Sequence, residues 1–329
     1  MQYRPLGKTN LKVSTVALGC WQFGGGKLWG EQTSDTVRDI VHTAIDAGIN
    51  LFDTAEGYGD GRSEEMLGKA IGHRRDEVLI ATKVGKLSAE YIATACENSL
   101  KRLGTDVIDL YQIHWPRHVE PLEETMGALE KLRAQGKIRV IGVSNFGPND
   151  FDELTSVGRA ESNQFLYSML CRMMEDEVTP RCVQHDVSIL CYSPLAQGLL
   201  ADRWRSIDEV PPLRARNRLF SCNRPHTSHN EPGCETQVFE ALDQIRTICR
   251  DIGQPMGTVA LAWCLHQRGV ASVLAGARNP AQVTENARAA EIRIDDPTRA
   301  QLNAATDMVK SMLCPNLDII SEAARSALR

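Results

Sequence analysis

Four polar side chains of this 329-residue chain have the chemistry of a proton-transfer site: Asp53, Tyr58, Lys83 and His114. A free tyrosine has a pKa of about 10 and is a poor acid near neutrality. A lysine ammonium beside Tyr58 would stabilise the phenolate and lower its pKa. Asp53 could pair with Lys83 and keep it charged, and His114 could bind the same substrate oxygen as Tyr58. The set therefore predicts proton donation to a carbonyl oxygen that gains charge.

Such a site has no electron source, because no protein side chain donates hydride. We therefore expect a bound redox cofactor and the interconversion of a carbonyl and an alcohol. A metal site could be built from Cys222, His226, His229 and Cys234. Their spacing matches no common zinc pattern, so we expect no metal.

The four residues lie at or just after short β-branched runs, and these runs alternate with helical periods. The strand pattern occurs at 13–18, 49–52, 78–82, 107–113, 138–143, 162–166, 188–192 and 270–274. The helical pattern occurs at 37–45, 63–71, 92–99, 122–134, 149–157, 175–185, 236–250 and 256–267. Strands that alternate with helices pair in parallel, and eight such units predict a closed (β/α)8 TIM barrel. The carboxyl ends of its strands would bring the four residues to one face.

A doubly wound open sheet is the rival architecture, but its Gly-x-Gly-x-x-Gly loop is missing. Gly24-Gly25-Gly26 has the wrong spacing and is a flexible loop in our interpretation. The first dozen residues predict an N-terminal hairpin that could plug the bottom of the barrel. The irregular stretch 201–235 would form a long loop after the seventh strand, over the catalytic face. We expect residues 1–329 to be a single barrel domain.

The composition excludes several other classes of protein. A net charge of −5 argues against a nucleic-acid partner. No run of about 18 apolar residues predicts a membrane span, and the first residues do not resemble a signal peptide. The ten scattered cysteines fit reduced thiols in a cytoplasmic protein. The oligomeric state stays open, because the apolar pattern of the tail (Leu317, Ile320, Ala324) could dock on the barrel or on a neighbour.

Several motifs together resemble those of the aldo-keto reductases. They are Phe52-Asp53-Thr54-Ala55-Glu56-Gly57-Tyr58-Gly59, Ala81-Thr82-Lys83, Leu110-Tyr111-Gln112-Ile113-His114-Trp115-Pro116, Gly142-Val143-Ser144-Asn145-Phe146 and Tyr192-Ser193-Pro194-Leu195. The stretch Ser193-Pro194-Leu195-Ala196-Gln197-Gly198-Leu199 is most similar to a bacterial branch that also resembles the potassium-channel β subunits. The likeness spans roughly residues 3 to 300 and keeps the family's order and spacing.

The resemblance implies roles for these residues. Tyr58 would be the general acid in reduction and the base in oxidation, Lys83 and Asp53 would tune it, and His114 would orient the carbonyl. Positions that match the nicotinamide site are Ser144, Asn145 and Gln164 for the carboxamide and Tyr192 for the ring. Other implied cofactor contacts are Gly19, Cys20, Trp21, Ser193, Leu195 and Gln197. The substrate pocket would be lined by Trp21, Tyr58, His114 and Trp115.

The adenosine end departs from the commonest family pattern. Asn279-Pro280 followed by Gln282 predicts a helix start, which is a natural phosphate site. Many relatives have Lys-Ser before this helix and an Arg inside it, whereas this chain has Gly276-Ala277 and Gln282.

Two arginines are candidates to replace the lysine contacts of these relatives. Arg278 is the cation nearest the predicted helix, and the branch implies a phosphate site built from Gly276, Arg278, Gln282, Glu285 and Asn286. Arg203 is the candidate replacement for a lysine that touches the cofactor pyrophosphate. We favour NADP(H), with NAD(H) possible, because one Arg can still make a bidentate phosphate contact.

The favoured function is an NAD(P)H-dependent oxidoreductase of the alcohol dehydrogenase type, acting on a small aldehyde, ketone or sugar. The alternative is a cofactor-binding module that senses redox state with little turnover, since the channel β subunits keep the same four residues. A barrel hydrolase or isomerase would need a metal or paired carboxylates at strand ends. Asp53 and Glu56 are too local to one loop for that chemistry.

Overall fold

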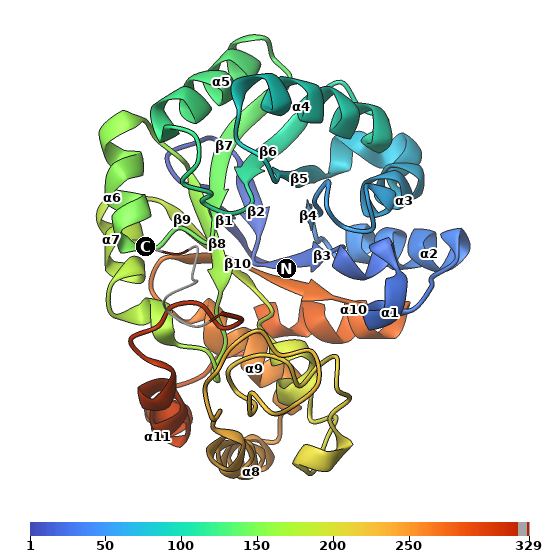
Figure 1. Cartoon of the computed structure of the whole chain (residues 1–329). Helices are drawn as coiled ribbons and strands as arrows, with labels where there is room; N and C mark the ends of the chain where they lie inside the picture. Colours follow the sequence, from blue (N-terminus) through green and yellow to red (C-terminus); the bar gives the residue numbers. More distant parts are fainter. Residues whose placement is uncertain (322–327, 329) are drawn as a thin grey trace.

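Eight parallel strands form a closed barrel in the order β10-β3-β4-β5-β6-β7-β8-β9 (Figure 1). The computed structural model describes residues 1–321 and 328. The strands are β3 (Val16–Gly19), β4 (Leu51–Asp53), β5 (Leu79–Val84), β6 (Ile108–Ile113), β7 (Ile138–Ser144), β8 (Ser162–Leu166), β9 (Ser188–Tyr192) and β10 (Val270–Gly276). The (β/α)8 TIM barrel predicted from the alternating pattern is confirmed.

Helices surround the barrel (Figure 1), and all of those described except the one-turn helix Gly26–Trp29 bury apolar residues. They are α1 (Gly26–Trp29), α2 (Ser34–Asp46), α3 (Arg62–Ile71), α4 (Ala89–Leu103), α5 (Leu122–Ala134), α6 (Pro148–Val157), α7 (Val178–Gln184), α8 (Glu235–Asp251), α9 (Met256–Leu265), α10 (Pro280–Ala287) and α11 (Asp296–Leu313). Helix starts follow their caps: Thr33 and Ser88 each accept a hydrogen bond from the backbone N–H three residues later. The sequence pattern missed α11, which packs against α8.

The predicted first strand, 13–18, is wrong because the chain leaves one sheet and enters another within it. Val13 belongs to a hairpin of β1 (Tyr3–Pro5) and β2 (Lys12–Ser14), and the barrel strand begins at Val16. The Ser14 hydroxyl donates to the Val16 carbonyl at 2.7 Å, and the Thr15 N–H donates to the Gln2 carbonyl at 2.9 Å. These two bonds turn the backbone at the junction.

The hairpin plugs the bottom of the barrel, as the sequence predicted. Its Leu6 and Val13 are fully buried and join the small apolar cluster inside the barrel. The strands contribute Ala17, Leu51, Ala81, Leu110, Val140, Leu190, Ala271 and Leu274 to that cluster. Apolar residues thus fill the lower interior, which leaves the polar site to the carboxyl ends of the strands.

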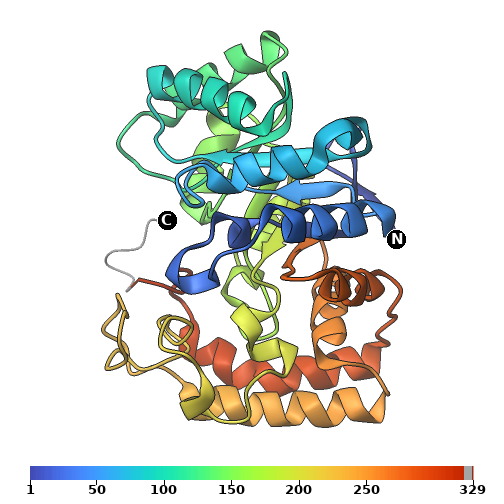
Figure 2. The same ribbon diagram turned by 90° about the vertical axis from the view of Figure 1, so that its right-hand side faces the viewer.

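Within the long segment 201–235, residues 202–234 form turns and bends, one short 3-10 helix, η5 (Ile207–Glu209), and an isolated bridge at Ser228. Figure 2 shows the segment, in yellow and gold, at the same end of the barrel as the dark red tail. Across residues 1–321 and 328, no helix has both the length and the apolar character of a membrane span. All ten cysteines lie among the described residues, and each is a free thiol.

Candidate active site

Lys83 is the centre of the polar cluster at the carboxyl ends of the strands. It is fully buried on β5, and its Nζ donates to Asp53 Oδ1 at 2.6 Å and to the Thr54 carbonyl at 2.7 Å. The third contact of Nζ is the Tyr58 hydroxyl at 3.3 Å. The His114 ring lies edge-on to the Tyr58 ring, with centroids 5.8 Å apart. The structure therefore brings together all four residues that the sequence singled out.

Two glutamines hold the second oxygen of Asp53. Gln164 Nε2 donates to Asp53 Oδ2 at 2.8 Å, and Gln112 Nε2 donates to the same oxygen at 3.2 Å. Gln164 Nε2 also lies 3.3 Å from Gln112 Oε1. A buried ion pair is stable only when its remaining hydrogen-bonding positions are filled. The glutamines meet this need for the Asp53–Lys83 pair.

Burial and the neighbouring charges compete to set the charges of the cluster. Burial raises the pKa of Tyr58, and the nearby Lys83 ammonium opposes this rise without cancelling it. The expected net lowering of the Tyr58 pKa is therefore wrong. Burial lowers the pKa of Lys83, but Asp53 and Tyr58 outweigh it, so the pKa is raised. Burial, aided by Lys83 and Arg117, lowers the pKa of His114 to about 3. At neutral pH the site holds a neutral phenol, an ammonium and a neutral imidazole.

The loop that carries Tyr58 is fixed by close contact with the loop after β3. The Thr54 hydroxyl donates to Ser63 Oγ at 2.8 Å, and the Ser63 hydroxyl donates to the Cys20 carbonyl at 2.7 Å. A Cβ on Gly24 would lie 2.8 Å from the carbonyl carbon of Tyr58. Glycine at position 24 thus permits this approach of the two backbones.

A row of aromatic rings continues from Tyr58 in both directions. Trp21 lies 5.9 Å from Tyr58, and Trp29 lies 5.2 Å from Trp21, measured between ring centroids. On the other side, Trp115 lies 6.5 Å from His114. The row gives the site an apolar wall that restricts water around the Tyr58 hydroxyl.

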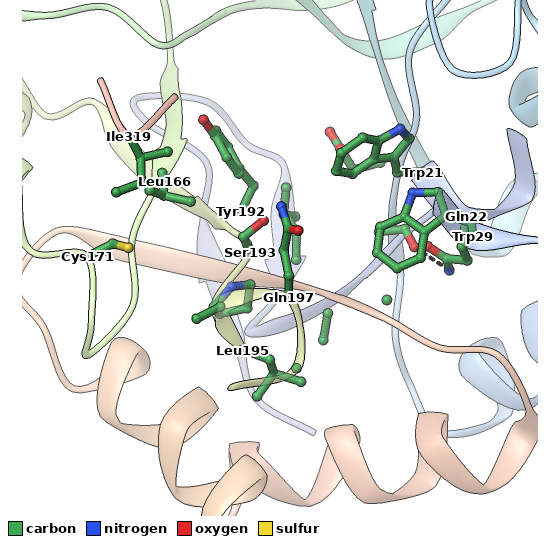
Figure 3. A pocket seen from close by; sticks show the side chains of 18 of the residues that line it. Trp21, Gln22, Trp29, Leu166, Cys171, Tyr192, Ser193, Leu195, Gln197 and Ile319 are labelled. Carbon is green, nitrogen blue, oxygen red and sulfur yellow. Dashed lines mark hydrogen bonds between the residues drawn. The ribbon is translucent and has the colours of Figure 1, made fainter. Parts of the chain in front are cut away.

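Asn145 ties the ends of three strands together at the opposite wall. Its Nδ2 donates to the His114 carbonyl at 3.0 Å and to Ser144 Oγ at 3.1 Å. Its Oδ1 accepts a hydrogen bond from the Tyr192 hydroxyl at 2.9 Å. Asn145 has a φ of 61°, in the left-handed region, which asparagine tolerates better than most non-glycine residues. The aromatic face of Tyr192 is thereby fixed beside the cavity (Figure 3).

These walls enclose a cavity of about 530 Å³, within the usual range of ligand and cofactor sites. Most of the predicted site residues line it: Gly19, Cys20, Trp21, Asp53, Tyr58, His114, Trp115, Ser144, Asn145, Gln164, Tyr192, Ser193, Leu195, Gln197, Arg203, Gly276, Arg278 and Gln282. Lys83 lies beneath the surface of the cavity. Glu285 and Asn286 lie on α10 outside the lining, where Asn286 Nδ2 donates to the Gly276 carbonyl at 3.2 Å. Asn279 caps α10 as predicted, accepting from the Gln282 N–H.

Four arginines line the other end of the cavity: Arg203, Arg214, Arg216 and Arg278. Within the part of the chain that the structure describes, none of them forms an ion pair with a carboxylate. Burial and the other three guanidinium groups lower the pKa of Arg214 to about 10. The cluster is therefore an unneutralised positive region suited to an anion.

The Arg214 side chain also connects the long loop to the first loop. Its guanidinium lies 4.2 Å from the Trp29 ring and donates to the Gln197 carbonyl at 3.2 Å. Three polar atoms here are buried without a hydrogen-bond partner among the described residues, namely Trp29 Nε1, Gln197 Oε1 and Arg216 Nε. Unsatisfied buried groups are costly, which favours a polar ligand in contact with them.

Comparison with known proteins gives the family. A model described as the Aldo/keto reductase family matches residues 15–307. The chain belongs to the aldo/keto reductase family. The NADH-specific methylglyoxal reductase of Escherichia coli is 34% identical, over 90% of this chain and 95% of that protein. The probable voltage-gated potassium channel subunit beta of Arabidopsis thaliana is 30% identical, over 89% of this chain and 92% of that protein. This aldo/keto reductase is an NAD(P)H-dependent oxidoreductase.

A solved structure supports the same assignment. An aldo-keto reductase from Klebsiella pneumoniae in complex with NADPH superposes with a TM-score of 0.73. The two sequences are 30% identical, and the match covers 92% of this chain and 95% of the Klebsiella pneumoniae chain. The barrel of this aldo/keto reductase is thus shared with a member that binds a nicotinamide cofactor.

Sequence reasoning missed some residues of the site in this aldo/keto reductase: Gln112 beneath the cavity, which holds Asp53, and Leu166, Trp29 and Ile319 in its lining. Gln112 lies two positions before His114, and Leu166 lies two positions after Gln164. Because side chains on the same face of a strand recur every two residues, this spacing could have identified both. Trp29 and Ile319 come from a loop and from the tail. No local sequence pattern predicts which wall such residues will join.

Proposed function

We propose that this aldo/keto reductase transfers hydride between NADP(H) and the carbonyl carbon of a small aldehyde, ketone or sugar, with Tyr58 as the proton donor. One observation carries the proposal. The Tyr58 hydroxyl faces a cavity of about 530 Å³ and lies 3.3 Å from the ammonium of Lys83, which is buried and ion-paired. A neutral phenol beside a fixed cation is suited to proton donation, because its conjugate base is stabilised where it forms.

The chain's own residues account for the proton and for orientation. The Tyr58 O–H donates its proton to the carbonyl oxygen, and the Lys83 ammonium stabilises the resulting phenolate. A neutral His114 ring N–H donates a hydrogen bond to the same oxygen. Asp53 keeps Lys83 charged through their 2.6 Å contact. In the oxidative direction the Tyr58 phenolate accepts the proton.

The cavity fits a nicotinamide cofactor, which supplies or accepts the hydride when bound. The fit is supported by the four arginines without carboxylate partners and by the unpartnered Gln197 Oε1. Ser144, Asn145 and Gln164 would hold the carboxamide, and the Tyr192 ring would stack on the nicotinamide.

We propose NADP(H) as the preferred cofactor. Arg203, Arg214, Arg216 and Arg278 provide more positive charge than a pyrophosphate requires, and the guanidinium fork suits a terminal phosphate. Two of the named relatives differ in this respect: the Escherichia coli reductase is NADH-specific, and the Klebsiella pneumoniae structure is in complex with NADPH. We also propose a cytoplasmic location, where ten free thiols would stay reduced.

The second candidate is a redox-sensing module with little turnover. It is favoured by the similarity to the Arabidopsis channel subunit. The two functions differ in the number of hydride transfers that each site performs.

A steady-state assay tests the proposal. Purified protein is given NADPH and NADH in parallel with a panel of aldehydes, ketones and sugars. We expect at least one carbonyl to be reduced for many turnovers per site, with higher kcat/KM for NADPH. Consumption that stops at one equivalent of NADPH per site would instead identify a sensor. A higher kcat/KM with NADH would contradict the cofactor preference alone.

A further inference from the structure

The last described stretch of the chain, residues 314–321, is a tail that follows α11 and reaches the cavity. Leu317 and Ile320 pack against the main core, and Ile319 is only 6% exposed. Ile319 and Ile320 both line the cavity. The tail therefore docks on the barrel of its own chain through these residues; Ala324, the other apolar position in the expected pattern, lies outside the described residues.

Arg218 of the long loop holds this tail through its main chain. The Arg218 side chain is buried, and its Nη1 donates to the Asn316 carbonyl at 3.0 Å and the Asp318 carbonyl at 2.8 Å. Nη2 donates to the Leu313 carbonyl at 2.6 Å. The backbone N–H of Arg218 donates to the Ile319 carbonyl at 2.8 Å. Arg218 thus binds four main-chain carbonyl groups between Leu313 and Ile319.

The charge of Arg218 is balanced by Glu231 of the same loop. Arg218 Nε donates to Glu231 Oε2 at 2.7 Å. A buried guanidinium with a carboxylate partner and three carbonyl acceptors is well satisfied, so it fixes the groups around it. Removal of its side chain would leave the Glu231 carboxylate and the three carbonyls without this donor.

A second attachment lies on the other side of Ile319. Ser321 forms a parallel bridge with Ser228 of the long loop. Between the two attachments, Asp318 Oδ1 accepts the N–H groups of Ile320 at 2.8 Å and Ser321 at 3.2 Å. The turn that presents Ile319 is therefore held at both ends by the 201–235 segment.

The tail completes an apolar wall of the cavity. Figure 3 shows Ile319 on the same side as Leu166 and Cys171, across from Trp21 and Trp29. Tyr192 lines the same cavity as Ile319 and Ile320. A hydroxylated substrate group against this wall would lose water without gaining a hydrogen bond.

We propose that Arg218 is a positioning residue for substrate choice: it holds Ile319 and Ile320 in the cavity wall, and this wall selects carbonyl compounds with an apolar substituent over polyhydroxylated ones. The inference rests on the proposed function, because it assigns a substrate class to the same site. An apolar pocket discriminates by about tenfold to a hundredfold for such differences.

The test compares benzaldehyde with glyceraldehyde in four proteins: the wild type, Arg218→Ala, Ile319→Ala and Arg75→Ala. Arg75 is the matched control, because it also binds a carboxylate, Asp109, and two carbonyls, those of Val78 and Val107, but at the opposite end of the barrel. Steady-state kinetics give KM and kcat, fluorescence titration gives the Kd for NADPH, and amide hydrogen exchange reports on residues 318–321.

We expect the wild type to prefer benzaldehyde by kcat/KM. Arg218→Ala and Ile319→Ala should reduce this preference about tenfold through a higher KM for benzaldehyde, with kcat and the Kd for NADPH nearly unchanged. Only Arg218→Ala should speed amide exchange at residues 318–321. Arg75→Ala should leave both the preference and the exchange of the tail unchanged.

Unchanged exchange of the tail in Arg218→Ala, or an unchanged preference in Ile319→Ala, would overturn the inference. If Arg218→Ala fails to fold, Ile319→Ala and Ile320→Ala still decide the specificity. If the wild type reduces neither aldehyde nor any other carbonyl, the proposed function fails, and with it the substrate choice. The exchange data would then still test whether Arg218 holds the tail.

Discussion

Burial and neighbouring charges together set the charges of the individual residues in the candidate active site. Lys83 keeps its proton because Asp53 lies 2.6 Å away, whereas His114 loses its charge because burial lowers its pKa to about 3. Burial raises the pKa of Tyr58. The residue types and their strand-end positions allowed the cluster to be predicted. The direction of the Tyr58 pKa could not be, because burial outweighs the Lys83 charge and depends on the whole fold.

The pH dependence of reduction follows from these pKa values. A raised pKa keeps Tyr58 protonated, and thus active as an acid, up to at least its ordinary value of about 10. His114, with a pKa of about 3, is neutral at any pH well above 3. We expect kcat/KM for reduction, measured at fixed NADPH, to be flat between about pH 5 and 9 and to fall only on the alkaline side. A limb near pH 6.5 that disappears in His114→Gln would show that His114 titrates there instead.

At the scale of elements, the two loops that follow β3 and β4 must approach closely to place Tyr58. Gly24→Ala would put a Cβ 2.8 Å from the Tyr58 carbonyl carbon, so the loops must separate. We expect kcat to fall about tenfold or more, because the hydroxyl would move away from Lys83. The control is Gly127→Ala on α5, where a Cβ meets nothing within 4 Å. Full kcat in Gly24→Ala would show that this contact does not position Tyr58.

The elements differ in how far the sequence could predict them. Strand and helix periods predicted the barrel, because each element repeats its own pattern locally. The split at Ser14 escaped this reasoning, since the apolar pattern continues across the junction of two sheets. The tail could not be placed either. Its position depends on Arg218, which lies 100 residues before Asp318 in the chain.

At the scale of the whole molecule, charge is distributed unevenly: the net charge is −5, yet the cavity carries a cluster of positive charge. Four arginines gather at one cavity, and Arg203, Arg214 and Arg216 come from the long loop. A positive cavity in an acidic protein attracts an anionic cofactor and guides it to the site. Arg203, Arg214 and Arg216 are close in the sequence, but only the fold brings Arg278, which follows β10, beside them.

Tyr58→Phe tests the central claim most directly, because it removes one hydroxyl and leaves the rest of the cavity in place. Fluorescence titration gives the Kd for NADPH, and stopped-flow absorbance gives the rate of a single hydride transfer to a carbonyl that the wild type reduces. We predict an NADPH Kd within about threefold of wild type and a transfer rate at least about a hundredfold lower. A variant that binds NADPH equally well and transfers hydride at the wild-type rate would contradict the assignment of Tyr58 as the proton donor.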